Sequence, residues 1–185
     1  MAVNTRLVAD ANGVLEKNAV TYPRTGNIMA MYPLAETVAK AENGMLLGVN
    51  YANGVIEYPT TNSDAIMILD SAEKEYDSNV VGLDQHYLTP EHGYMPRLGK
   101  LEVNDRFTTS TVAYDNAVFA DVEAIAAAVE AGTAVYGKPC TVAGFEGCIE
   151  LTKTLPTTKV ALKVVKVTTI PNGDAGIKFA VIKAD

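Results

Sequence analysis

Two histidines, His86 and His92, lie six positions apart in a stretch with acidic side chains, and they are the first candidates for chemistry. Imidazole binds metal ions and exchanges protons near neutral pH. One hypothesis is a metal site formed by both histidines and a nearby carboxylate, Asp84 or Glu91. The spacing matches no established ligand pattern. The sequence therefore favours the other hypothesis, two polar loop residues that hydrogen-bond to the backbone.

The two cysteines, Cys140 and Cys148, form neither a Cys-x-x-Cys redox motif nor a paired zinc motif. We interpret them as small buried apolar residues of a reduced compartment. A disulfide across the turn at Gly144 and Gly147 is the first alternative. A metal site is the second, although it needs more ligands than lie nearby.

Two acidic pairs have the residue types used in glycoside hydrolysis, Asp115 with Asp121 and Glu146 with Glu150. Such pairs also arise by chance, because 22 of the 185 residues are acidic. The sequence contains no nucleophile elbow, phosphate-binding loop or dinucleotide fingerprint. We therefore expect no enzyme and no catalytic, cofactor-binding or metal-binding residues. A hydrolase that uses a carboxylate pair or a histidine-bound metal is the enzymatic alternative.

Several tyrosines fall in predicted turns and loops. A tyrosine at a loop tip is a good contact residue, because its ring buries area while its hydroxyl stays hydrogen-bonded. The alternative is that these rings line the half-buried rim of a sheet. The candidates are Tyr51, Tyr58, Tyr76, Tyr87, Tyr94, Tyr114 and Tyr136.

Composition and charge narrow the function classes. The chain is 48% apolar and 20% charged, which excludes a disordered protein, and its length suits one domain or two small ones. The formal net charge of −7 argues against nucleic acid and against an anionic membrane surface as partners. Residues 1–10 lack the basic start and apolar run of a secretory signal peptide. We expect assembly in the cytoplasm.

Asn-Gly pairs, which favour tight β-hairpin turns, are the main structural signal. They occur at 12–13, 43–44, 53–54 and 172–173. The pair at 53–54 separates the apolar segments 45–51 and 55–58. The last pair joins 160–170 with 177–182, both rich in β-branched residues. Strict alternation fails between Lys163 and Lys166, which predicts a bulge or an exposed end there.

One helix is predicted over residues 122–131. Asp121 is placed to cap its first turn, and Val122, Ile125 and Val129 form an apolar stripe that suits docking on a sheet. A shorter helix or a turn is predicted over 34–41, after Pro33.

The fold class that follows is mainly β (β-rich α+β), a small hairpin-built barrel or sandwich with one short helix near 122–131. We expect a hairpin-rich N-terminal lobe over residues 1–99, with a long irregular loop segment at 70–99. A barrel-like C-terminal lobe with the helix covers 100–185. The alternative is a single domain.

Two segments carry a resemblance to a known family. The strand–turn–strand segment 100–111 and the closing hairpin 162–182 resemble those of accessory virion proteins of tailed bacteriophages, in particular head decoration or cement proteins. The resemblance implies a β-rich protein without signal sequence or cofactors. It also implies that the protein binds the outer face of an assembled shell.

We therefore expect a non-enzymatic structural virion protein that decorates or cements a phage capsid. It would be assembled in the host cytoplasm and located in the virion. The expected partners are the major capsid protein or other virion proteins, with self-association into a trimer or dimer, and without nucleic acid or membrane. One alternative is a tail, neck or fibre subunit. Another is a β-barrel carbohydrate or ligand-binding module, which the lack of tryptophan disfavours.

Overall fold

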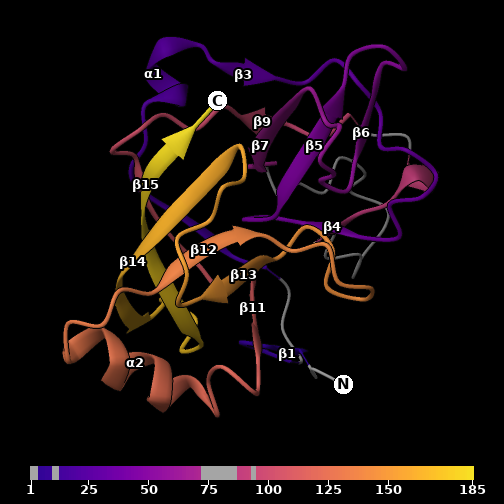
Figure 1. Cartoon of the computed structure of the whole chain (residues 1–185). Helices are drawn as coiled ribbons and strands as arrows, with labels where there is room; N and C mark the ends of the chain where they lie inside the picture. Colours follow the sequence, from indigo (N-terminus) through magenta and orange to yellow (C-terminus); the bar gives the residue numbers. More distant parts are fainter. Residues whose placement is uncertain (1–3, 10–12, 72–86, 93–94) are drawn as a thin grey trace.

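A computed structural model describes residues 4–9, 13–71, 87–92 and 95–185 of the chain. The fold is mainly β, as expected from the hairpin signals. Figure 1 shows a large curled sheet with a helix at one end and a smaller sheet at the other. The large sheet has the strand order β1-β11-β13-β12-β14-β15-β10-β2. Its strands are β1 (Asn4–Arg6), β2 (Leu15–Ala19), β10 (Arg106–Thr109), β11 (Val112–Asp115), β12 (Tyr136–Pro139), β13 (Ile149–Thr152), β14 (Val160–Thr169) and β15 (Ala175–Ala184).

The smaller sheet has five antiparallel strands in the order β3-β9-β7-β5-β6. Two further short strands, β4 and β8, pair with each other. In the large sheet every pairing is antiparallel except that of β11 with β13. The bounds are β3 (Ile28–Met29), β4 (Ala41–Glu42), β5 (Leu46–Asn50), β6 (Val55–Glu57), β7 (Ala65–Leu69), β8 (Tyr87–Leu88) and β9 (Leu98–Gly99).

The longest hairpin joins β14 to β15 where Asn172-Gly173 predicted one, but its loop has five residues (170–174) in place of the tight two-residue turn. Thr169 pairs with Ala175, and Gly173 has φ +94°. The register shifts between Val164 and Lys166, where we expected a bulge. Val165 is the extra residue. As a consequence Lys163 and Lys166 lie on the same face of the sheet, whereas plain alternation would place them on opposite faces.

The β5–β6 hairpin is also present, but its turn differs from the predicted two-residue turn. Asn50 pairs with Val55, which leaves a four-residue loop. Only Gly54 has a positive φ (+63°), whereas a type I′ turn would need one at Asn53 as well. Instead, the Asn53 N–H donates to the Asn50 side chain at 3.0 Å. The Asn-Gly pair therefore predicted the chain reversal but not its turn type.

The other two Asn-Gly pairs do not join paired strands, so hairpins are the wrong prediction there. Gly44 (φ +86°) turns the chain between β4 and β5, but β4 pairs with β8 in a separate sheet. Asn12 lies outside the described residues, and the flanking strands β1 and β2 pair with β11 and β10. A local turn motif reverses the chain, whereas burial of each strand's apolar face decides its neighbour.

The predicted helix is α2 (Val122–Glu130). The Asp121 carboxylate accepts a hydrogen bond from the Ala124 N–H at 2.7 Å, as expected for a cap. Ile125 is fully buried, and Val122 and Val129 pack against the core. The helix therefore docks on the sheet by its predicted stripe.

Two other segments differ from the helix prediction over 122–131. The segment 34–41 contains a turn at Glu36 and Thr37, not a helix. One helical turn was missed in the sequence, α1 (Tyr22–Thr25), which has a proline in its first turn and ends at Gly26 with φ +74°. A 3-10 turn, η1 (Pro90–His92), follows β8.

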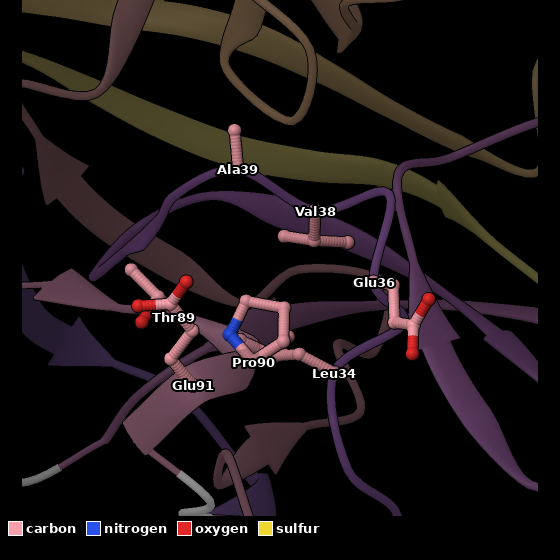
Figure 2. A pocket seen from close by; sticks show the side chains of 7 residues that line it. All are labelled: Leu34, Glu36, Val38, Ala39, Thr89, Pro90 and Glu91. Carbon is pink, nitrogen blue, oxygen red and sulfur yellow. The ribbon is translucent and has the colours of Figure 1, made fainter.

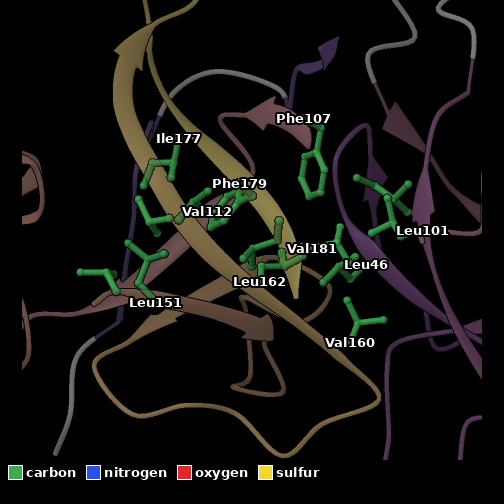
Figure 3. Close-up of a cluster of buried hydrophobic side chains, with 14 of the residues drawn as sticks. Leu46, Leu101, Phe107, Val112, Leu151, Val160, Leu162, Ile177, Phe179 and Val181 are labelled. Carbon is green, nitrogen blue, oxygen red and sulfur yellow. The ribbon is translucent and has the colours of Figure 1, made fainter. Parts of the chain in front are cut away.

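The main core contains side chains from both the large sheet and the smaller sheet. Leu46 and Ile68 of the smaller sheet pack in one cluster with Phe107 and Phe179 of the large sheet. The two rings are 5.7 Å apart between centroids. Figure 3 shows Leu46 close to the side chains of β14 and β15. In addition, β1 and β2 from the N-terminal segment pair with C-terminal strands. The lobe boundary near residue 100 stays a prediction.

Candidate interaction surface

Both cysteines are buried free thiols, which confirms their interpretation as small apolar residues. Cys140 and Cys148 belong to a second apolar cluster, and the Cys140 N–H donates to the Cys148 carbonyl at 2.8 Å. Burial raises the pKa of Cys140 to about 11 and that of Cys148 to about 12. At neutral pH both side chains are therefore protonated and poor nucleophiles.

The acidic pairs considered for glycoside chemistry have structural partners. The carboxylates of Asp115 and Glu146 each accept an N–H from a residue two positions away, at 2.8 and 2.7 Å. Asp121 caps α2, and Glu150 forms an ion pair with Lys138 at 3.3 Å. All four carboxylates thus stabilise a turn, a helix end or a strand pair.

The histidine hypothesis is not tested by the structure. His86 and Asp84 lie outside the described residues, and only the backbone of His92 is described. Among the side chains that are described, no group of three or more histidine, cysteine or acidic residues could hold a metal ion.

A buried carboxylate that sequence reasoning missed is Glu42 on β4, whose exposed fraction is 0%. It accepts hydrogen bonds from the Arg6 guanidinium (3.3 Å for the longer contact) and from the Gly13 N–H (2.8 Å), and it forms an ion pair with Lys40. Burial alone would raise the pKa of Glu42, but the hydrogen bonds from Arg6 and Lys40 outweigh burial and lower it. The cluster fastens edge strand β1 to β4.

Two further acids hold α1 in place. Asp105, which is buried, accepts hydrogen bonds from the Thr21 N–H at 3.0 Å and the Glu102 N–H at 2.9 Å. Asp70 accepts a hydrogen bond from the Tyr22 hydroxyl at 3.1 Å and pairs with Lys17. Asp105 and Asp70 therefore stabilise the fold, as Glu42 does.

The tyrosines predicted as contact residues differ in how exposed they are. Tyr51 is exposed at the β5–β6 loop, whereas Tyr114 is buried and Tyr58 and Tyr136 are half-buried. Tyr76, Tyr94 and the side chain of Tyr87 lie outside the described residues. Sequence reasoning missed Tyr32, whose ring makes an edge contact with that of Tyr51 at 6.3 Å between centroids and 64° between planes.

The contact between Tyr32 and Tyr51 belongs to a group of exposed apolar side chains. Tyr51 has 53% of its surface exposed, and Met31, next to Tyr32 in the chain, has 61% exposed. Gly54 closes the loop close to the Tyr32 ring, since a Cβ on Gly54 would lie 3.7 Å from it. We call Met31, Tyr32 and Tyr51 the tyrosine tip. Large apolar side chains that are exposed and held by neighbours are typical anchors of protein interfaces.

A cavity of about 740 Å³ is lined by residues that follow the tip in the chain and by η1. Leu34 and Val38 are buried residues of its wall, and Glu36 and Glu91 are exposed at its rim. Figure 2 shows Leu34 and Pro90 between the two carboxylates. Apolar side chains beside two carboxylates would suit a ligand that is partly apolar and carries a positive charge. The full lining is Leu34, Glu36, Val38, Ala39, Thr89, Pro90 and Glu91.

Comparisons with known proteins do not assign this chain to a family. No family model matches the sequence, and no solved structure matches it. The chain is similar to transferrin-binding protein A of Neisseria meningitidis serogroup B, with 32% identity over 95 residues, both to the sequence from strain MC58 and to a second sequence from that serogroup. The match covers 45% of this chain and 10% of that protein, so the chain spans about a tenth of its relative's length.

Within the part of the chain that the structure describes, no helix has the length and apolar character needed to cross a bilayer.

Proposed function

We propose that the chain is a non-enzymatic structural protein of a phage virion, which binds the outside of the capsid and decorates or cements the shell. The observation that carries the proposal is the tyrosine tip, where Tyr51 is exposed on the β5–β6 loop against the Tyr32 ring, and Met31, next to Tyr32 in the chain, is exposed as well. The resemblance of segments 100–111 and 162–182 to decoration proteins supports the virion as the setting.

The tip has properties that favour docking on a repetitive surface. The Tyr51 ring contacts the Tyr32 ring before binding, so Tyr51 loses less conformational entropy when a partner covers it. Exposed tyrosine and methionine each contribute substantial apolar contact. When many copies meet a symmetric shell, contacts of modest strength suffice to reinforce it. A tail, neck or fibre subunit would use the same contacts at another site on the particle.

The cavity supports a second candidate function, a small-ligand binding module. Its volume of about 740 Å³ lies in the usual range for ligand sites. The carboxylates of Glu36 and Glu91 would select a cationic ligand. Such a ligand should raise the melting temperature of the wild-type chain, and the shift should vanish in Glu36→Gln/Glu91→Gln. The meningococcal relative's name states transferrin binding for that protein, and neither proposal rests on it.

Co-sedimentation with purified capsids that lack the chain tests the leading proposal. Met31→Ser/Tyr51→Ser should lose about 1–2 kcal/mol of binding free energy per anchor, because interface anchors typically contribute that much. Val142→Ser/Leu155→Ser removes two other exposed apolar side chains and is the matched control. Equal binding by the tip variant and the wild type would contradict a role of the tip.

A further inference from the structure

Four cations lie on the outer face of the large sheet, opposite the core. Strand register places Lys163 of β14, Ala180 of β15 and Arg106 of β10 in one row across the sheet. Lys166 and Lys178 form the next row and point to the same side, because Lys178 is two positions from Ala180. We call Arg106, Lys163, Lys166 and Lys178 the basic face.

These four cations have no ion-pair partner among the described residues. Lys166 and Lys178 stand directly opposite each other, and like charges in that arrangement destabilise a strand pair. A chain with net charge −7 thus gathers four cations without a bonded carboxylate on one surface, although Glu16 of β2 lies on the same side, two strands from Lys178. Other basic side chains do meet carboxylates, namely Arg6, Lys17, Lys40, Arg97, Lys138 and Lys183.

The same chain carries a complementary surface on α2. Glu123, Ala127 and Glu130 are exposed and repeat at helical spacing on the side away from the buried Ile125. The helix contains no basic residue, and neither glutamate has an ion-pair partner among the described residues. We call these three residues the acidic stripe.

The distance between the two charges of the acidic stripe is similar to the distance between two charges of the basic face. Seven helical positions separate Glu123 from Glu130 by about 10 Å. Two strand spacings separate Lys163 from Arg106 by about 10 Å as well. Between the charges lies a small residue on each side, Ala127 on the helix and Ala180 on the sheet, which permits close approach. A helix laid across the three strands would therefore match both charges at once.

We propose that the basic face of one copy docks on the acidic stripe of a second copy. The two surfaces differ, so the contact is heterologous and joins copies head to tail, closing into a ring where the rotation permits. Exposed Val165 and Ile182 border the basic face and add apolar contact. This apolar border and the negative net charge favour a protein occupant over nucleic acid. The inference does not depend on capsid binding.

Sedimentation velocity of the full chain at increasing salt tests this contact. The wild type should self-associate, and salt should weaken the association because the pairs are at the surface. Arg106→Glu/Lys163→Glu and Glu123→Lys/Glu130→Lys should each weaken it by at least about tenfold. Mixing the two variants should restore it, since opposite charges again face each other. Arg24→Glu/Lys100→Glu, which reverses two exposed cations elsewhere, should associate like the wild type.

Circular dichroism separates loss of fold from loss of contact, and Arg106→Gln/Lys163→Gln provides a milder pair of substitutions. A wild-type chain that stays monomeric at every concentration would overturn the inference. So would charge reversals that leave association unchanged, or a mixture that fails to associate when both variants are folded. Binding of duplex DNA by the four cations in place of self-association would also overturn it. In each case capsid co-sedimentation remains a separate readout.

Discussion

At the residue scale, replacement of the buried Glu42 should have a large effect on stability. Removing one partner from a buried ion pair leaves a charge uncompensated and typically costs about 3–5 kcal/mol. We expect Glu42→Gln to lower the free energy of unfolding in urea by an amount at the lower end of this range, because Arg6 is partly exposed. Glu36→Gln, at an exposed site, is the control. Equal stability of both variants would contradict the proposed clamp.

The same residue gives a pH dependence with a defined sign. The folded-state pKa of Glu42 is lowered, so its contribution to stability is present above the unfolded value of about 4.3 and is lost as pH falls through the folded value. The stability difference between wild type and Glu42→Gln should therefore shrink at acid pH. Urea unfolding of both proteins between neutral and acid pH measures it. A difference that grows with acidity would have the wrong sign.

The buried thiols give a second residue-scale prediction. With pKa values of about 11 and 12, Cys140 and Cys148 should react slowly with a disulfide reagent such as DTNB at about pH 8 in the folded protein. Both should react promptly after unfolding in urea, where thiol pKa values return to about 8.5. Rapid reaction of either thiol in the native protein would show that the second core cluster is open to solvent.

At the scale of elements, the cap of α2 is a local interaction whose removal can be measured cleanly. Asp121→Ala deletes the hydrogen bond to the Ala124 N–H, and loss of such caps costs about 1 kcal/mol. Urea unfolding should detect this loss. Asp121→Asn, which retains an acceptor, should recover most of it. If both variants were equally destabilised, the carboxylate charge rather than capping would be responsible.

The elements also show what the sequence could and could not predict. The β14–β15 hairpin, its bulge and α2 were predictable because their signals are local, such as the Asn-Gly turn and the Asp121 cap. The pairing of β4 with β8 was not, because it depends on strands about 45 positions apart in the chain. Glu42 and Tyr32 were missed for the same reason. Their partners, Arg6 and Tyr51, come from distant segments.

At the scale of the whole molecule, we propose that three surfaces serve distinct contacts. In this proposal the tyrosine tip provides apolar anchors toward a shell, and the basic face and the acidic stripe provide a contact between copies. The two sheets share one core, so these surfaces are carried by a common scaffold. Charge reversal on the basic face should therefore affect self-association without removing the anchors at the tip.

The most direct measurement is the binding of the purified wild-type chain to purified phage capsids from which it is absent. We expect saturable co-sedimentation, with a number of bound copies set by the symmetry of the shell, and greater resistance of the decorated particles to heat. A chain that stays in the supernatant at every concentration, while folded and with its tip exposed, would contradict capsid binding.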